Sequence, residues 1–241
     1  MFSKLSMFVL APLLLHQGKR VRAQTLRLPE AAGPRSGFSP ASNGSGLENA
    51  PLSVLVLGDS AAAGVGSETQ TEAVCGQWVR ELQQQRDVHW QLIAQSSLTC
   101  SGILALLKAS ALTIPTQPLN KVLISAGVND VTRRTSLSAW KQDLQALTNY
   151  LTNELNTEQI IYTSLPPMHA FPALPQPLRW FIGQQAKQLN RALKHHCEAQ
   201  SNTYFLDFNI PFDTKYMAKD GYHPSKEATR IWAEQAVKAT A

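Results

Sequence analysis

Cysteine, charge and long apolar runs are all scarce in this sequence, and each scarcity excludes a class of protein. Only three cysteines occur in 241 residues, without a Cys-x-x-Cys pair and without a histidine at metal-ligand spacing. At most one disulfide can form, and a zinc site is not expected. Charged residues make up 16% of the chain and hydrophobic residues 44%, which indicates a globular protein rather than a disordered one.

Positive charge is concentrated near the N-terminus. The formal net charge of +5 falls within residues 1–36, and the rest of the chain carries equal numbers of basic and acidic residues. The pI near 9.2 therefore describes the N-terminal segment and not the bulk of the chain. A nucleic-acid-binding domain, which needs a basic surface of its own, is not expected.

Residues 1–23 combine an apolar run with a basic cluster. The run Leu5–Leu15 is too short to cross a bilayer by itself and contains Pro12. It is similar to a signal peptide, but the basic residues after it lie where a cleavage region is ordinarily neutral. Two interpretations stay open. In the first, residues 5–22 lie in a membrane interface, as an anchor or an uncleaved signal-like segment of a membrane-associated or exported protein. In the second, they pack on the domain as a short helix of a cytoplasmic protein.

Two further regions follow. Residues 24–51 are rich in Pro, Gly, Ser and Asn, which predicts a linker or an arm over the surface. In residues 52–241, short apolar runs alternate with amphipathic ones. Strands are predicted at residues 54–57, 90–94, 121–125, 159–164 and 203–207, and helices at residues 76–85, 103–108, 137–153, 178–199 and 226–239. This alternation predicts one α/β domain, a three-layer α/β/α sandwich with a five-stranded, mainly parallel sheet, whose site lies at the carboxyl ends of the strands.

The first of these predicted strands leads directly into a serine. Four apolar residues, Val54 to Leu57, are followed by Gly58-Asp59-Ser60 and then by small residues as far as Gly66. A hydroxyl at the carboxyl end of a buried strand, with backbone N–H groups of the following turn beside it, is a candidate nucleophile. The structural alternative makes Ser60 an ordinary helix N-cap.

Two later turns carry groups that suit such a serine. Asp220 precedes His223 by three residues, so its carboxylate can accept a hydrogen bond from the imidazole Nδ1–H and leave Nε2 as a base. Asn129, after the third predicted strand, offers an amide that can donate to an oxyanion. The alternatives are that Asp220 caps a turn beside a surface His223, and that Asn129 is a turn residue with unusual backbone angles.

In this order, Gly58-Asp59-Ser60, Gly127-Val128-Asn129-Asp130 and Asp220-Gly221-Tyr222-His223 resemble the motifs of the SGNH hydrolases, also called the GDSL esterase/lipase family. The resemblance covers roughly residues 52–240. It implies a flavodoxin-like SGNH hydrolase fold, with Ser60 as nucleophile, His223 as general base and then acid, and Asp220 as the residue that orients His223. It further implies that the Ser60 N–H and Asn129 donate to the oxyanion, and that the reaction needs no metal and no cofactor.

A remaining family motif usually supplies a glycine whose N–H completes the oxyanion hole. Here the sequence is Ala94-Gln95-Ser96-Ser97, and Ser97 stands where that glycine is expected. A serine still has an N–H, but a backbone with positive φ is costly for it. A distorted loop would slow the reaction, because the loss of one oxyanion donor costs on the order of 3 kcal/mol.

The predicted function is hydrolysis of carboxylic esters through an acyl-enzyme intermediate. The apolar loop at residues 166–175, extended by Trp180 and Phe181, favours apolar acyl groups and thus an esterase, lysophospholipase or thioesterase type of activity on a small-molecule or lipid ester; simple packing is the alternative. Gly-x-Ser-x-Gly is absent around Ser60, which argues against the α/β-hydrolase elbow. Two rival interpretations are an inactive SGNH-fold protein that binds acylated ligands, and a flavodoxin-like binding module, although the latter leaves Asp220 and His223 unexplained and lacks a phosphate-binding loop.

Overall fold

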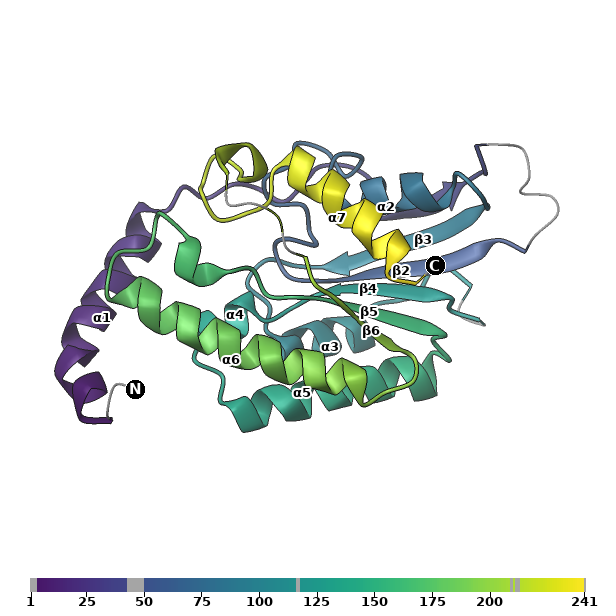
Figure 1. Ribbon diagram of the computed structural model, residues 1–241. Coiled ribbons are helices and arrows are strands. Elements are labelled where there is room, and N and C mark those ends of the chain that lie inside the picture. Colours follow the sequence, from purple (N-terminus) through teal and green to yellow (C-terminus); the bar gives the residue numbers. More distant parts are fainter. Residues whose placement is uncertain (1–3, 43–49, 116–117, 209, 211–212, 241) are drawn as a thin grey trace.

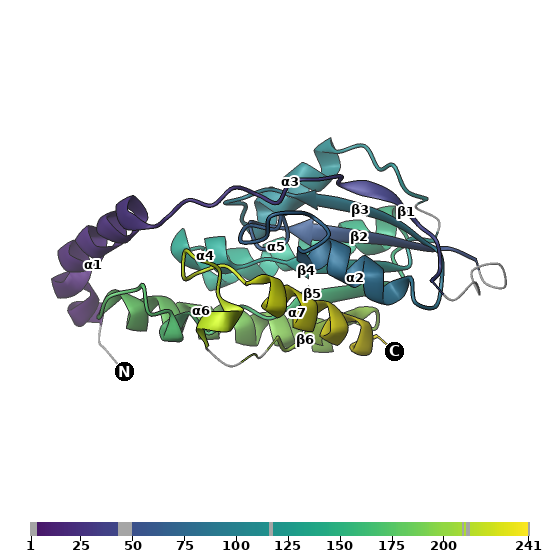
Figure 2. The ribbon, with the colours of Figure 1, turned by 90° about the horizontal axis from the view of Figure 1, so that it is seen from above.

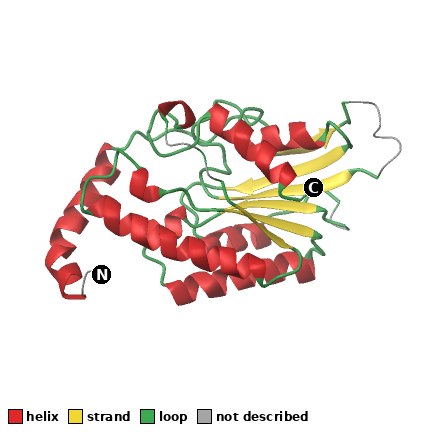
Figure 3. Cartoon of the chain, viewed as in Figure 1, coloured by secondary structure: helices red, strands yellow, loops and turns green. Residues whose placement is uncertain are grey.

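The computed structural model describes residues 4–42, 50–115, 118–208, 210 and 213–240, with side chains from Leu10 onward. A single sheet crosses the molecule, with helices packed above and below it and one helix at the end where most strands finish (Figures 1 and 3). The predicted α/β class and three-layer arrangement are confirmed.

The sheet has six strands in the order β1-β3-β2-β4-β5-β6. In chain order these are β1 (Ser36–Ser39), β2 (Leu52–Gly58), β3 (Val88–Ala94), β4 (Lys121–Ser125), β5 (Gln159–Thr163) and β6 (Thr203–Leu206). All neighbours pair in parallel except β1, which is antiparallel to β3.

The prediction of five strands is therefore wrong by one, and the missed strand is β1. Its four residues, Ser-Gly-Phe-Ser, contain one large apolar side chain, and Phe38 is exposed. An edge strand needs only the backbone hydrogen bonds of its partner, so it carries no buried apolar run that a sequence pattern would reveal. Part of the segment predicted as a linker or arm is thus a strand of the sheet.

Helices cover both faces of the sheet (Figure 2). The helices are α1 (Lys4–Gln24), α2 (Val74–Leu82), α3 (Cys100–Ala109), α4 (Val128–Thr132), α5 (Leu137–Asn149), α6 (Leu178–Glu198) and α7 (Lys226–Lys238). Helix α2 packs with α7 on one face, and α3, α5 and α6 pack together on the other. The predicted helix over 137–153 ends in a π-helical turn, Tyr150–Glu154.

Strand β2 lies at the centre of the core and is buried on both faces. All seven of its residues are buried, and successive side chains point to opposite faces. Leu55 and Leu57 join the core beneath α3, α5 and α6, while Val54 and Val56 join the core beneath α2 and α7. A strand buried on both faces reads as a continuous apolar run, as in parallel sheets generally.

Helix α1 rests against the beginning of α6, beyond the carboxyl ends of the strands (Figure 1). Leu14 is buried there, and the Gln17 side chain bonds the Gln176 carbonyl at 2.8 Å and the Leu178 N–H at 3.2 Å. Leu13 and Leu15 remain 43% and 56% exposed. No helix of the described residues combines the length and apolarity needed to cross a membrane.

All three cysteines are free and buried, so the one disulfide that the sequence allows does not form. Burial raises the pKa of Cys75 and of Cys197 to about 12 and that of Cys100 well above its usual value. Thiols held neutral in this way are structural rather than reactive.

Candidate active site

Three strand ends meet where the site is expected. Gly58, the last residue of β2, is paired with Ala94 at the end of β3 and with Ser125 at the end of β4. The turn after each strand therefore emerges beside the other two. Ser60 and Ser97 follow β2 and β3 on such turns, and Asn129 lies in the short helix α4 that follows β4, so a parallel sheet brings together side chains and N–H groups that are far apart in the chain.

Ser60, His223 and Asp220 form a continuous chain of hydrogen bonds. His223 Nε2 lies 2.8 Å from Ser60 Oγ, and His223 Nδ1 lies 2.6 Å from Asp220 Oδ2. The other carboxylate oxygen of Asp220 accepts hydrogen bonds from the backbone N–H groups of Tyr222 and His223, at 2.9 and 3.1 Å. Asp220 thus both caps the turn and contacts the imidazole, which unites the two interpretations that the sequence left open.

Asp220 fixes the proton position on His223. Its side chain is only 1% exposed. Burial raises the pKa of this carboxyl, but hydrogen bonds from the His223 ring and from two backbone N–H groups outweigh it and lower the pKa overall. An ionised carboxylate can only accept, so Nδ1 carries the ring proton and Nε2 is free to accept the Ser60 proton.

The turn after Ser60 packs directly on the loop that carries His223. Gly66 has φ of +103°, and a Cβ there would come within 2.8 Å of the Pro224 carbonyl oxygen and of Ala218 Cβ. Only glycine fits this close approach without a shift. The serine and the imidazole are thereby held against each other by backbone contact as well as by their hydrogen bond.

The Ser97 backbone adopts the conformation that a glycine would favour. Its φ is +71°, in the left-handed region. Within the described part of the chain, the Ser97 N–H and the Ser60 N–H donate to no protein acceptor. Both N–H groups are therefore free to donate to a ligand, which is what an oxyanion hole requires of its donors.

Asn129 lies in a short helix rather than in an irregular turn. Helix α4 begins directly after Gly127, whose φ is +113°. The Asn129 amide Nδ2 is 3.4 Å from Asp59 Oδ2. One amide hydrogen is directed by this long contact, which leaves the second available to a ligand beside Ser60.

Asp59 is a residue that the sequence analysis did not assign. It is 2% exposed, and Oδ1 accepts from the Ala61 N–H at 3.1 Å and from Ser125 Oγ at 3.2 Å. Burial raises its pKa to about 6. Asp59 connects the Ser60 turn, the end of β4 and Asn129, and its only sequence signal is its place inside the Gly-Asp-Ser motif.

The apolar loop at residues 166–175 contacts the His223 turn. The Phe171 and Tyr222 rings meet edge to face, with centroids 5.7 Å apart. Phe171, Met168 and Leu174 are nevertheless buried in the core beside α6. Packing therefore accounts for much of the apolar character of this loop.

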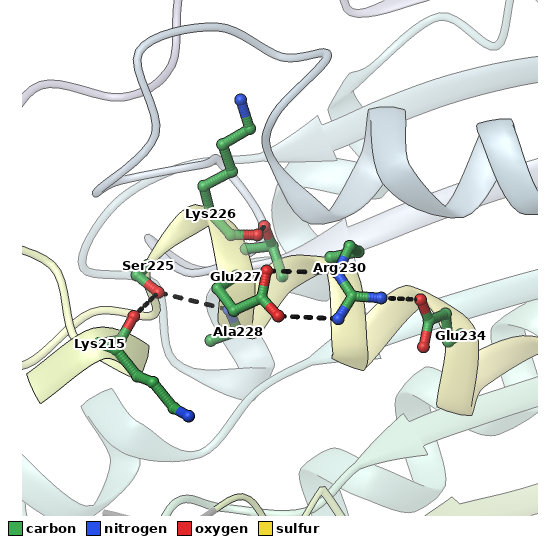
Figure 4. A network of polar contacts seen from close by, with 8 residues as sticks. Lys215, Ser225, Lys226, Glu227, Ala228, Arg230 and Glu234 are labelled. Carbon is green, nitrogen blue, oxygen red and sulfur yellow. Dashed lines mark hydrogen bonds and ion pairs between the residues drawn. The ribbon is translucent and has the colours of Figure 1, made fainter. Parts of the chain in front are cut away.

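A polar network that begins two residues after His223 in the chain stabilises the start of α7 (Figure 4). Ser225 Oγ accepts from the Ala228 N–H and donates to the Lys215 carbonyl at 2.6 Å. Arg230 pairs with Glu227 and Glu234. An open hollow of about 360 Å³ lies here, but its residues include none of the Ser60, His223 or Asp220 group.

No cluster of three or more His, Cys, Asp or Glu side chains that could hold a metal ion occurs among the described residues. His196 also has a buried partner, since its Nε2 lies 2.8 Å from Thr148 Oγ1 between α5 and α6.

A serine, an imidazole and a carboxylate bonded in series at the strand ends of an α/β sheet are the arrangement of a serine hydrolase. Within that class the chain belongs to the GDSL-like lipase/acylhydrolase family, whose sequence model matches residues 56–231. The resemblance found in the three motifs is confirmed, and membership places the chain among ester hydrolases at the level of the family. Among curated proteins, none matches the chain in sequence.

Solved structures share this fold. The lipase/acylhydrolase from Enterococcus faecalis is 18% identical with a TM-score of 0.61, and the match covers 78% of this chain and 94% of that one. An acetyl xylan esterase from Geobacillus stearothermophilus is 19% identical with a TM-score of 0.54, covering 78% and 94%. A GDSL-like lipase from Bacteroides thetaiotaomicron is 17% identical with a TM-score of 0.54, covering 94% and 96%. At these sequence identities the similarity establishes a shared fold and nothing about substrate.

Proposed function

We propose that this protein hydrolyses carboxylic esters through an acyl-enzyme on Ser60. The observation that carries the proposal is the hydrogen-bonded series from Ser60 Oγ through His223 to Asp220. His223 Nε2 takes the hydroxyl proton as Ser60 attacks the ester carbonyl, and Asp220 stabilises the imidazolium that forms. His223 then returns the proton to the leaving alcohol, and a water activated by the same imidazole releases the acid.

The negative charge of the tetrahedral intermediate is held by the Ser60 N–H, the Ser97 N–H and the Asn129 amide. The two backbone donors have no protein acceptor among the described residues, and Asn129 is oriented by Asp59. Donors already fixed before the charge develops stabilise it without reorganisation. The left-handed backbone of Ser97 supports its role in place of the glycine that the family usually has.

The acyl group that we propose is apolar, giving an esterase, lysophospholipase or thioesterase type of activity. The support is the contact of the loop at residues 166–175 with Tyr222, next to His223. Solved structures of the same fold carry the names lipase/acylhydrolase and acetyl xylan esterase, which are compatible with ester hydrolysis but do not define the acyl length.

The test is hydrolysis of p-nitrophenyl esters from acetate to long acyl chains by the wild type and by Ser60→Ala. We expect activity that Ser60→Ala removes and that rises with chain length beyond acetate. Activity that survives Ser60→Ala would refute the assignment of Ser60 as the nucleophile. Tight binding of acylated ligands without turnover in the wild type would instead favour the inactive, ligand-binding interpretation.

For the chain as a whole, we propose that residues 52–241 carry the hydrolase domain, preceded by an arm at 24–51 and an N-terminal segment at 1–23. We propose peripheral membrane contact through residues 5–22, because Leu13 and Leu15 are exposed close to Lys19 and other basic residues. Flotation with anionic vesicles is expected for the wild type and reduced for Leu13→Ser/Leu15→Ser. Absence of flotation in the wild type would contradict the proposed membrane contact.

A further inference from the structure

The arm before β2 contacts both turns that supply the unused N–H groups. On the Ser60 side, the Ala32 N–H donates to the Glu68 carbonyl at 3.1 Å, and the Gln70 N–H donates to the Ala32 carbonyl at 2.8 Å. Gly64 approaches the arm so closely that a Cβ there would lie 2.6 Å from Ala31 Cβ. The arm is therefore packed against the turn that follows the nucleophile.

On the Ser97 side, the arm contributes an ion pair whose two side chains hydrogen-bond the backbone at the end of β3. Glu30 Oε1 accepts from the Ser96 N–H at 2.7 Å, and Glu30 Oε2 pairs with Arg35 Nη2 at 2.6 Å. Arg35 Nη1 in turn donates to the Ala94 carbonyl at 2.6 Å. We call Glu30 and Arg35 the clamp; its two side chains hold two backbone groups, the carbonyl of Ala94 and the N–H of Ser96.

A third bond fixes the far side of Ser97. Arg133, which follows α4, donates from Nη2 to the Ser97 carbonyl at 2.9 Å. The Ser96 N–H belongs to the peptide before Ser96, and the Ser97 carbonyl belongs to the peptide after Ser97. The peptide between them carries the Ser97 N–H, and it is oriented by bonds on either side of it that leave this N–H unused.

We propose that Glu30 and Arg35 are positioning residues for the oxyanion hole, holding Ser97 in the left-handed conformation so that its N–H faces the intermediate formed at Ser60. This inference rests on the proposed function. Glycine adopts such a backbone freely, whereas serine must be held there by surrounding contacts. Glu30 and Arg35 lie outside the residues that the family model matches, so the clamp is supplied by this chain's own N-terminal arm.

The charge state of Glu30 suits this role. Partial burial raises the pKa of Glu30, but the hydrogen bond from Ser96 and the pairing with Arg35 lower it overall. The carboxylate is therefore ionised at neutral pH, and its bond to the Ser96 N–H is charge-assisted and stronger than a neutral one.

The first experiment compares Glu30→Ala with a matched control, Glu72→Ala. The Glu30 and Glu72 side chains are 29% and 28% exposed, and their ion pairs are 2.6 and 2.7 Å long, but Glu72 pairs with Lys226 and bonds no part of the Ser97 turn. We expect Glu30→Ala to lower kcat for a p-nitrophenyl ester about tenfold with little change in KM, a fraction of the effect of deleting an oxyanion donor. Glu72→Ala is expected to keep kcat within about twofold of the wild type. Equal kcat values for Glu30→Ala and the wild type would overturn the proposal.

A second set of variants separates positioning from general destabilisation. Replacing Ser97 by glycine removes the strain that the clamp offsets, so Glu30→Ala should cost less kcat in the Ser97→Gly protein than in the wild type. Arg35→Met should resemble Glu30→Ala, and the double variant should lose less than the sum of both, because they act as one unit. An undiminished loss of kcat in the Ser97→Gly background would show that Glu30 does not act through the Ser97 backbone and would overturn the proposal.

Amide hydrogen exchange over residues 95–98 keeps the proposal testable without activity. Glu30→Ala should exchange faster there than the wild type, and Glu72→Ala should not. A wild type that hydrolyses no ester refutes the proposed function, while unchanged exchange in Glu30→Ala refutes the clamp.

Discussion

The proposed acid–base half of the site and its proposed oxyanion half are built in different ways. Asp220 and His223 lie three residues apart in one turn, and the carboxylate caps that turn while it orients the ring. The Ser60 N–H, the Ser97 N–H and Asn129 come instead from the segments that follow three different strands, and the arm adds a fourth segment through Glu30. A short stretch of sequence is enough to bring Asp220 and His223 together, whereas the oxyanion donors meet only because their strands pair in the sheet.

The acid–base half should carry the largest effect. In Asp220→Asn the amide no longer stabilises the imidazolium or the tautomer that leaves Nε2 free, so kcat is expected to fall about 10³- to 10⁴-fold. The control is Asp213→Asn, since Asp213 also caps a turn, through the Lys215 N–H at 3.1 Å, but contacts no histidine. Steady-state kinetics on a p-nitrophenyl ester measure both. A loss below tenfold in Asp220→Asn would place the acid–base half below the oxyanion half and break the comparison.

The same residue predicts a pH dependence of stability. The pKa of Asp220 is lowered in the folded protein, so its contribution is present above the pKa of the unfolded chain and is lost as pH falls through the folded pKa. Chemical denaturation of the wild type and Asp220→Asn should therefore give a difference in unfolding free energy that shrinks in acid. A difference that grows in acid would contradict this assignment.

Asn129 tests the oxyanion half. Removing one donor by Asn129→Ala is expected to lower kcat about 10²- to 10³-fold while KM changes little. Asn120→Ala is the control, because Asn120 bonds the Ser53 N–H at 2.8 Å at the opposite end of the same strands. It should lower stability without lowering kcat. Similar kcat losses in both variants would mean that Asn129 serves the fold alone.

Asp59 connects the Ser60 turn to Ser125 and Asn129 on the proposed oxyanion side, and it gives a smaller effect, on stability. Burial raises its pKa to about 6, so its favourable contribution is fully present below the ordinary carboxyl pKa and is lost as pH rises through about 6. Between pH 4 and pH 7 the wild type should lose up to about 3 kcal/mol of unfolding free energy relative to Asp59→Asn. Denaturant titrations at a series of pH values measure this, and parallel curves would refute it.

Much of the fold could be predicted from the sequence because most strands are buried on both faces. Strand β4 begins and ends at the predicted residues, and β2 and β5 extend or shorten by one or two. Strand β1 could not be predicted, since an exposed edge strand of Ser-Gly-Phe-Ser is stabilised by the backbone of β3 rather than by its own side chains.

The residues of the candidate site also divide into those that the sequence could predict and those that it could not. Ser60, His223 and Asp220 could be proposed from motifs, and the structure brings them into hydrogen-bond contact. Asp59 could not be assigned, because only the folded chain shows that its carboxylate reaches Ser125 and Asn129.

The sequence by itself determined the buried strands, the turns at their ends and the Asp-x-x-His turn, because these depend on residues close together in the chain. Only the tertiary structure decided the backbone of Ser97. A serine has no local reason to adopt φ of +71°. The bonds that hold it come from Glu30, 66 residues from the Ser96 that it binds, and from Arg133, 36 residues from Ser97, whose carbonyl it binds. Strain at one residue persists where contacts from distant segments outweigh it, and such contacts form only when the sheet has brought those segments together.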